Sequence, residues 1–443
     1  MLTNILDMIH NKDYQGARAE LIRLNPVDLA AQFEDLNPYE QIKIFRMLPK
    51  NEAAEVFSYF SREIQINMIA MITDKELREI IDELFLDDAV DLFEEMPANV
   101  VKRLLKNTDD QTRSLINQFL KYPEDSAGSI MTIEYVDLRR NMTVQQALDH
   151  IKETGIEKAT VYTSYVIDEA RKLIGTVSAL DLLITDRSET IDKIIESNVP
   201  HVKTNADQEE AARLFDYYDL IALPVTDMED RLVGIITVDD IVDVIQEENT
   251  EDFEKMAALL PSDKPYLETG SLFLARKRIP WLLFLMFSAM FTGGIISYFE
   301  DSLAVMPALV AFIPMLMDTG GNCGSQAATL VIRGLALGQV KMRDAIKVLL
   351  KEFQISIIVG AVLSVINIIR IYFMNSSLIL AITVGLSLYV TVIIAKVTGS
   401  MLPIIAERLK LDPAIMASPV ITTIVDASAL LAFFSIARLL LKI

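Results

Sequence analysis

Cysteine, tryptophan and histidine are the residues that this 443-residue sequence has least of. Its one cysteine, Cys323, excludes a disulfide framework and any site built from several thiolates. The three histidines, His10, His150 and His201, are scattered and form no metal-binding pattern. Zinc and other transition metals are therefore not expected, and any bound metal should be a hard cation with oxygen ligands.

Basic residues are scarce in the first part of the chain. Residues 1–275 contain 27 lysines and arginines against 54 aspartates and glutamates, whereas residues 276–443 contain 14 against 8. Such an acidic region lacks the basic surface that nucleic acid requires, so nucleic acid is excluded and cations are favoured as partners. The start, MLTNILDMIHNKDYQ, also lacks the apolar core of a signal peptide, so no cleaved signal is expected.

Charge is rare over long stretches of residues 276–443. Five stretches approach the roughly 20 apolar residues that a membrane-spanning helix needs. The second and fourth are long enough to be tilted or broken, and Pro403 is a candidate kink in the fourth. The sequence therefore predicts an all-α polytopic membrane domain with five helices, at 279–298, 303–332, 353–369, 378–405 and 414–437.

Lysine and arginine are unevenly distributed between the loops that join these stretches. They precede the first stretch as ARKR (275–278) and recur in every second loop. The opposite loops contain only Arg370, although Arg438 and Lys442 run against the trend. Because positive loops stay in the cytoplasm, we expect a multi-pass protein of the cell membrane with its N-terminus inside and its C-terminus outside.

The second stretch contains the polar sequence PMLMDTGGNCGSQ (314–326). Gly320 and Gly324 form a small-xxx-small pair, which by itself explains only close helix packing. Packing does not explain Asp318 or Asn322, because such side chains are costly at membrane depth unless they face a partner or water. We expect the two adjacent glycines to loosen the helix and expose carbonyl groups toward a cavity. The candidate pore-lining residues are therefore Asp318, Gly320, Gly321 and Asn322.

Asp426 is the sole charge in AIMASPVITTIVDASALLAFFSIA (414–437), and it lies too deep to reach an interface. Helical spacing places it on one stripe with Pro419, Thr422 and Thr423. The threonine hydroxyls and the carbonyls freed by proline would add oxygen ligands beside the carboxylate. We interpret Asp426 and Thr422 as part of a cation pathway, and the alternative is a buried, hydrogen-bonded structural aspartate.

Two repeats organise the first part of the chain. Residues 1–127 alternate amphipathic helices with short breaks, and FEDLNP (33–38) recurs as FEEMP sixty residues later. Such helix pairs stack into a superhelix. A sharper repeat aligns LIGTVSALDLLI (173–184) with LVGIITVDDIVD (232–243), at an offset of 59. Each copy predicts a strand, a turn at Ser178 or Thr237, and a helix.

Tandem strand–strand–helix units with this G-x-x-[ST]-x-x-D pattern resemble paired CBS domains. Such pairs often bind adenine nucleotides, so ATP is a candidate regulatory ligand. An equally good interpretation is that each aspartate only stabilises the dipole of the helix that it begins. The candidate nucleotide-binding residues are Ser178, Asp181, Thr237 and Asp240.

An acidic helix is predicted after the second repeat, from about Thr237 through VDDIVDVIQEENTEDFEKMAALLP (238–261). Its carboxylates recur at i, i+3 and i+4, where like charges repel. A solvated acidic face is the commonest explanation of such a run. This run, however, leads through PYLETGSLFLARKR (265–278) to the first apolar stretch, where it could act as a lever. TDMEDRLVG (226–234) lacks the spacing of an EF-hand and predicts a hairpin between strands.

With this combination, the whole chain resembles the MgtE family of magnesium channels. The resemblance implies a multidomain protein with an α-superhelical N domain, an α/β CBS pair, a connecting "plug" helix and a five-helix membrane domain. We expect their boundaries at 1–127, at 128–190 and 191–246 for the two CBS domains, at 247–275, and at 276–443.

The same resemblance implies a homodimer in the lipid membrane, with one pore between the two membrane domains. A fifth-helix aspartate that recruits hydrated Mg²⁺ in this family falls on Asp426. Regulatory Mg²⁺ ions lie between the soluble domains and the plug helix of the family. Their ligands fall on Asp219, Asp240, Asp243, Glu248, Glu251 and Asp252, with Asp88 and Asp91 as looser matches.

Three hypotheses follow, none of them an enzyme. The first is a magnesium channel for uptake that cytoplasmic Mg²⁺ closes. The second is a nucleotide sensor whose helices only anchor it, and the third is a cation-coupled exchanger of divalent metals. Asp426 and the TGGN sequence (319–322) favour the first hypothesis over the second, because an anchor does not require them.

Overall fold

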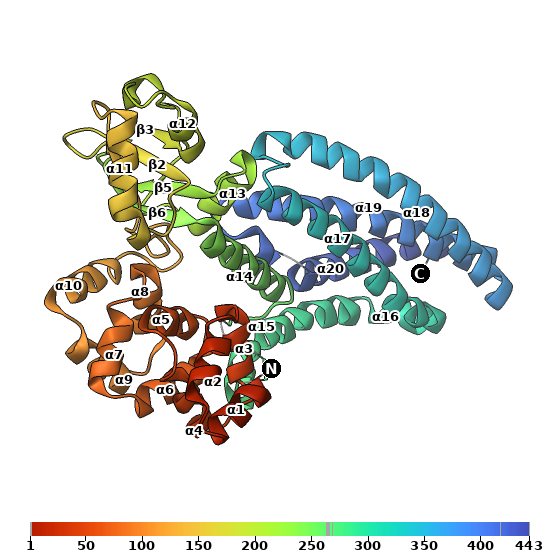
Figure 1. Cartoon of the computed structure of the whole chain (residues 1–443). Helices are drawn as coiled ribbons and strands as arrows, with labels where there is room; N and C mark the ends of the chain where they lie inside the picture. Colours follow the sequence, from red (N-terminus) through yellow and green to blue (C-terminus); the bar gives the residue numbers. More distant parts are fainter. Residues whose placement is uncertain (1, 263–265, 268, 417, 443) are drawn as a thin grey trace. The chain divides into compact units, whose positions relative to one another are not determined.

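The computed structural model describes residues 2–262, 266–267, 269–416 and 418–442. The chain divides into two compact units, Met1–Ile245 and Gln246–Ile443 (Figure 1). The first unit contains the short helices and both sheets, and the second contains the long helices. Helix α14 (Val238–Met256) begins in the first unit and ends in the second.

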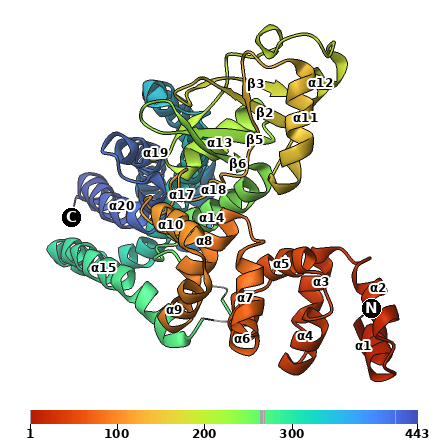
Figure 2. The ribbon, with the colours of Figure 1, turned by 60° about the vertical axis from the view of Figure 1, so that its left-hand side comes forward.

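Ten short helices open the first unit, as the amphipathic pattern predicts (Figure 2). Asn25 and Asn37 each stand before a proline and cap the following helix by accepting hydrogen bonds from its first backbone N–H groups. Alternate helices pack together, α3 on α5, α5 on α7 and α7 on α9, as in a stacked superhelix. The helices are α1 (Leu2–His10), α2 (Tyr14–Leu21), α3 (Pro26–Phe33), α4 (Pro38–Phe45), α5 (Lys50–Ser58), α6 (Arg62–Met71), α7 (Asp74–Ile81), α8 (Leu86–Glu95), α9 (Ala98–Asn107) and α10 (Asp110–Phe119).

Two three-stranded sheets confirm the tandem repeat. In each sheet the first strand pairs in parallel with the second, which pairs antiparallel with the third. Gly175 lies opposite Val166, and Gly234 lies opposite Val225, so the registers of the two sheets also repeat. The elements are β1 (Asp137–Arg139), α11 (Val144–Thr154), β2 (Thr163–Ile167), β3 (Leu173–Ser178), α12 (Ala179–Ile184), β4 (Val202–Lys203), α13 (Gln208–Tyr218), β5 (Ala222–Thr226) and β6 (Leu232–Thr237), followed by α14.

The repeated glycine has a physical reason. A Cβ atom on Gly175 would lie 2.7 Å from the carbonyl oxygen of Glu196, and one on Gly234 would lie 2.8 Å from that of Thr132. In each sheet a backbone segment from elsewhere therefore crosses the third strand at the glycine, which leaves no room for a side chain.

The second unit consists of long helices. Four helices of the described part are long and apolar enough to cross a membrane, and they span 271–298, 342–374, 378–408 and 413–441. The predicted stretch 303–332 is not one helix, because Met306–Phe312 separates α16 from α17. Helix α17 has sufficient length for a fifth span, but its polar residues make it less apolar than the other four. The helices are α15 (Ser271–Tyr298), α16 (Glu300–Val305), α17 (Ile313–Ala336), α18 (Ala345–Asn375), α19 (Leu378–Arg408) and α20 (Ser418–Leu441).

The connecting segment differs from the prediction of a helix over 247–275. Helix α14 follows β6 directly and ends at Met256, and the described residues between it and Ser271 are not helical. A left-handed backbone at Ala258 (φ 54°) and Pro261 end the helix there. The ARKR sequence lies inside α15, not ahead of it. The acidic helix therefore does not run straight into the first span.

Candidate functional site

The glycines of PMLMDTGGNCGSQ pack α17 against its neighbours. A Cβ atom on Gly320 would lie 2.8 Å from both Thr391 of α19 and Val425 of α20, and one on Gly324 would lie 2.7 Å from Ile421 of α20. The close helix packing that the glycine pair predicts is thus present, and a pore-lining role of Gly320 and Gly321 stays a prediction. The expected loosening is wrong, because α17 is helical without a break from Ile313 to Ala336. Packing on both sides holds the helix in place and prevents the glycines from opening it.

The opposite face of α17 is polar and exposed. Asp318, Asn322, Gln326 and Arg333 are exposed, whereas the glycines between them are buried. The first three recur every four residues, and Arg333 lies two turns further, so they form one polar stripe. Of these residues, sequence reasoning assigned a role only to Asp318 and Asn322. Gln326 and Arg333 were missed, although their helical spacing from Asn322 contained the signal.

Asp426 lies beside this stripe on α20. Its side chain is half-buried, and the carboxylate of Asp318 is near enough to interact with it electrostatically. Thr422 lies one turn before Asp426 and contacts α17 at Gly321, where a Cβ atom would come within 2.8 Å of the threonine methyl group. The hydroxyl of Thr422 donates a hydrogen bond of 2.9 Å to the carbonyl of Pro419, which leaves its oxygen lone pairs available.

The structure therefore brings together Asp318, Gly321, Thr422 and Asp426, as the sequence predicts. Among the described residues, however, no three histidine, cysteine, aspartate or glutamate side chains are placed to hold a metal ion. The chemistry of this group is that of a few carboxylate, hydroxyl and amide oxygens along an open face. Such a face suits a hydrated cation that passes along it better than a tightly held one.

A second acidic group lies in the first unit, where α8 begins near the start of α14. Burial, and then the charge of Asp240, raise the pKa of Asp88 to about 6. The same two causes raise the pKa of Asp87 well above its usual value. Burial also raises the pKa of Asp240, although a hydrogen bond from Thr237 opposes the shift. The structure thus brings the predicted Asp88 and Asp240 together, and it adds Asp87, which sequence reasoning missed.

Asp91 lies one helical turn after Asp88, and both line a polar hollow of about 240 Å³ together with Gln65. Asp219 and Asp243 are exposed. Asp219 adopts a left-handed backbone (φ 51°) that ends α13, which gives it a structural role.

The end of α14 carries a third acidic group, in the second unit. Burial, followed by the charge of Asp412, raises the pKa of Asp252 to about 6. Glu248 and Glu251 also act on Asp252, so three predicted carboxylates share one end of the helix. Asp412 belongs to the loop between α19 and α20 and was not predicted. It lies 160 residues after Asp252 in the chain, a separation at which no local pattern signals a contact.

Comparison with known proteins assigns the chain to a family. The MgtE model, described as a divalent cation transporter, matches residues 313–436; the model of the MgtE intracellular N domain matches 24–125; and CBS domains match 127–186 and 191–247. The magnesium transporter MgtE of Thermus thermophilus is 38% identical over 100% of this chain and 99% of its own length. The chain belongs to the MgtE family. MgtE proteins are transporters rather than enzymes.

Other MgtE proteins and their solved domains agree with this assignment. The magnesium transporter MgtE of Bacillus subtilis is 34% identical over 93% of both chains. The cytosolic domain of an Mg²⁺ channel MgtE, crystallised with ATP, is 38% identical, matches 55% of this chain and 100% of its own, and has a TM-score of 0.52. The soluble part of a magnesium transporter is 29% identical, matches 56% and 97%, and has a TM-score of 0.54.

In this MgtE protein the candidate nucleotide residues also serve as helix caps. Ser178 accepts a hydrogen bond from the backbone of Asp181, and its hydroxyl lies 2.5 Å from an oxygen of that carboxylate. Thr237 donates a hydrogen bond to Asp240 in the same way. Both aspartates thus have the structural role of the alternative interpretation. Nucleotide binding at these positions stays a prediction.

The membrane part of this MgtE protein also contains a buried ion pair. Lys396 of α19 and Glu352 of α18 are about 5% and 7% exposed, and the Nζ and Oε2 atoms lie 3.7 Å apart. The ammonium group of Lys396 is therefore paired with a carboxylate of the neighbouring helix inside the membrane part. Asn367 of α18 is buried as well, and its amide nitrogen has no hydrogen-bond partner among the described residues.

Proposed function

We propose that this MgtE protein is a magnesium channel of the cell membrane, and that cations pass along the polar stripe of α17 beside Asp426. The observation that supports it is the exposure of Asp318, Asn322 and Gln326 on a helix whose neighbours are apolar membrane spans. A polar stripe facing lipid is costly, whereas one facing water is not. Mg²⁺ loses its water reluctantly, so a wide, wet path with few carboxylates suits it.

The proposal includes a homodimer. In a single chain the stripe of α17 is exposed, and a second copy would cover it and enclose an aqueous path with one Asp426 from each chain. The lysine and arginine distribution supports a cytoplasmic N-terminus and an external C-terminus. Residues 1–127 would form the N domain, 128–190 and 191–246 the CBS pair, and 276–443 the membrane domain.

Regulation by cytoplasmic Mg²⁺ is the second element of the proposal. In the acidic groups around Asp88 and Asp252, burial, and then repulsion between neighbouring carboxylates, raise the pKa values of these two residues. A divalent cation would relieve that repulsion, so it binds better to an arrangement in which the carboxylates are close together. If that arrangement is the closed channel, Mg²⁺ inside the cell limits its own uptake. ATP is a further regulatory ligand of the proposal, supported by the ATP complex of the related cytosolic domain.

The test is Mg²⁺ uptake by liposomes that contain the purified full-length protein. Asp426→Asn should reduce uptake about tenfold or more, because loss of only about 1.4 kcal/mol of cation stabilisation already has that effect. Asp426→Glu, which keeps the charge, should be less impaired. Asp344→Asn is the matched control, since Asp344 lies in the loop before α18 and pairs with Lys347.

Each result has a clear meaning. Uptake that follows an inside-negative membrane potential without a counter-gradient supports a channel. Uptake that requires an opposing ion gradient indicates the exchanger, and a complete lack of flux in the unmodified protein indicates the anchored sensor. Unchanged uptake by Asp426→Asn would remove Asp426 from the pathway.

A further inference from the structure

Lys255 forms an ionic contact between the end of α14 and the loop that precedes α20. Its Nζ atom lies 2.7 Å from Oε1 of Glu251, one turn earlier on the same helix. It also lies 2.6 Å from Oδ2 of Asp412 in that loop. The side chain of Lys255 is about 20% exposed, and those of Glu251 and Asp412 are about 37% and 29% exposed, so this double ion pair is partly shielded from water.

The surroundings of Lys255 are strongly acidic. Burial lowers the pKa of Lys255, but Asp412 and Glu251 outweigh burial and raise it. The half-buried Asp252 interacts with the same lysine and with Asp412. One ammonium group thus faces three carboxylates, Glu251, Asp252 and Asp412, and does not neutralise them. The three carboxylates therefore bind the ammonium group of Lys255 and still carry an excess of negative charge.

With Lys255 between them, the described carboxylates are not placed to hold a metal ion. A divalent cation and the ammonium group of Lys255 cannot occupy this position together, because both need the same carboxylate oxygens. We propose that Lys255 is a built-in competitor of Mg²⁺ at the end of α14, and that it sets the Mg²⁺ concentration at which the channel closes. This inference rests on the proposed closing by cytoplasmic Mg²⁺. It goes further because it names the residue that determines the threshold, and the direction in which its removal acts.

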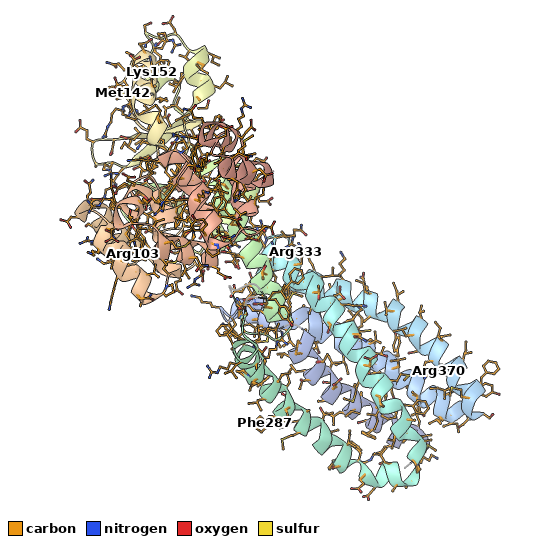
Figure 3. The ribbon with its side chains drawn as sticks, turned by 60° about the horizontal axis from the view of Figure 1, so that its bottom comes forward. Arg103, Met142, Lys152, Phe287, Arg333 and Arg370 are labelled. Carbon is orange, nitrogen blue, oxygen red and sulfur yellow. The ribbon has the colours of Figure 1, made fainter. Side chains whose placement is uncertain are left out.

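The ion pair between Lys255 and Asp412 lies close to the ends of α17 and α20, the two helices of the proposed cation path. Asp412, through its other carboxylate oxygen, accepts a hydrogen bond of 2.7 Å from the backbone of Ala414, just before α20. Earlier in α14, Asn249 accepts a hydrogen bond of 3.4 Å from Arg333 at the end of the α17 stripe. Figure 3 labels Arg333. An exchange of Lys255 for Mg²⁺ thus occurs at a direct contact with the membrane helices.

The test compares Lys255→Met with Lys255→Arg in the full-length protein. Lys255→Met keeps most of the side-chain length and removes the charge, so Mg²⁺ no longer competes with an ammonium group. The Mg²⁺ concentration that half-closes the channel in inside-out patch recordings should fall about tenfold, which corresponds to about 1.4 kcal/mol. Lys255→Arg keeps the charge and should close near the unmodified concentration. Lys347→Met is the matched control, because it removes an exposed lysine that pairs with Asp344 at 2.9 Å.

A second measurement does not depend on transport. Mg²⁺ should protect the detergent-solubilised full-length protein from protease, and Lys255→Met should shift this protection to lower Mg²⁺ by the same factor. If Lys255→Met folds poorly, Lys255→Gln provides the same comparison.

The outcomes separate the inference from the proposed function. A half-closing concentration that rises in Lys255→Met would mean that Lys255 holds the closed channel together, and an unchanged concentration would mean that Lys255 does not compete. Either result overturns the inference while closing by Mg²⁺ stands. If Mg²⁺ neither closes nor protects the unmodified protein, the regulatory part of the proposed function is wrong, and the inference falls with it.

Discussion

Gly399 is the position where the close packing of α17 against α19 tolerates least change. A Cβ atom at Gly399 would lie 2.2 Å from the backbone oxygen of Gly324 and 2.8 Å from its carbonyl carbon. Ordinary contacts of such atoms are 3.4–4 Å. The obstacle is backbone in the middle of a helix, so no side-chain rotation can relieve it. Gly399→Ala therefore requires the two helices to separate.

The size of the effect follows from this geometry. To restore normal contact, α17 and α19 must separate by about 1 Å, and interiors packed at crystal density do not absorb such a shift without loss of neighbouring contacts. Overpacking of this kind costs about 3 kcal/mol, at the upper end of its usual range. For a unit of this size, that loss lowers the midpoint of thermal unfolding by roughly 6–12 °C. Because α17 also carries the polar stripe, Mg²⁺ uptake should fall as well.

The assay is thermal unfolding of the purified protein in detergent, followed by Mg²⁺ uptake in liposomes. Gly293→Ala in α15 is the control, because a Cβ atom there would have nothing within 4 Å. It makes the same chemical change in another apolar helix and should leave both measurements nearly unchanged. If Gly399→Ala unfolds at the same temperature as Gly293→Ala, the close contact between α17 and α19 does not exist in the protein, and the placement of the stripe loses its support.

The remaining predictions concern the soluble residues. Because burial and Asp240 raise the pKa of Asp88 from 3.8 to about 6, the folded chain takes up a proton before the unfolded chain does. Without divalent cations, the free energy of unfolding should therefore increase as the pH falls from 7 to 5, and this contribution of Asp88 should be lost as the pH rises through 6. Urea unfolding should show this trend, and Asp88→Asn should weaken it. A variant in which Asp243, Glu248 and Glu251 are all neutralised should stay open in patch recordings at Mg²⁺ concentrations that close the unmodified protein. If the variant closes at the same concentration, the acidic residues of α14 only form a solvated face and do not regulate the channel. Asp181→Asn should weaken ATP binding to residues 1–256 by about tenfold in calorimetry, the loss expected for one charge-assisted hydrogen bond; an absence of ATP heat in the unmodified fragment would remove the nucleotide site altogether.

The sequence by itself determined the elements whose signals are local. Hydropathy located four of the membrane helices, because the need for about 20 apolar residues acts on consecutive positions. The offset of 59 residues between Gly175 and Gly234 determined two equivalent sheets, and the structure repeats even their registers. Helical spacing along α20 correctly grouped Thr422 with Asp426, since residues four apart share one face of a helix.

Only the tertiary structure decided which distant residues meet. The contacts between Lys255 and Asp412, between Glu352 and Lys396, and between Gly324 and Gly399 join residues from different parts of the fold. The end of α14 at Met256 and the unbroken course of α17 were also decided by the structure, against local expectation. The physical reason is that a glycine pair or a lone charge has several acceptable local conformations. Packing against neighbours far away in the chain selects one of them, and those neighbours leave no mark in the local sequence.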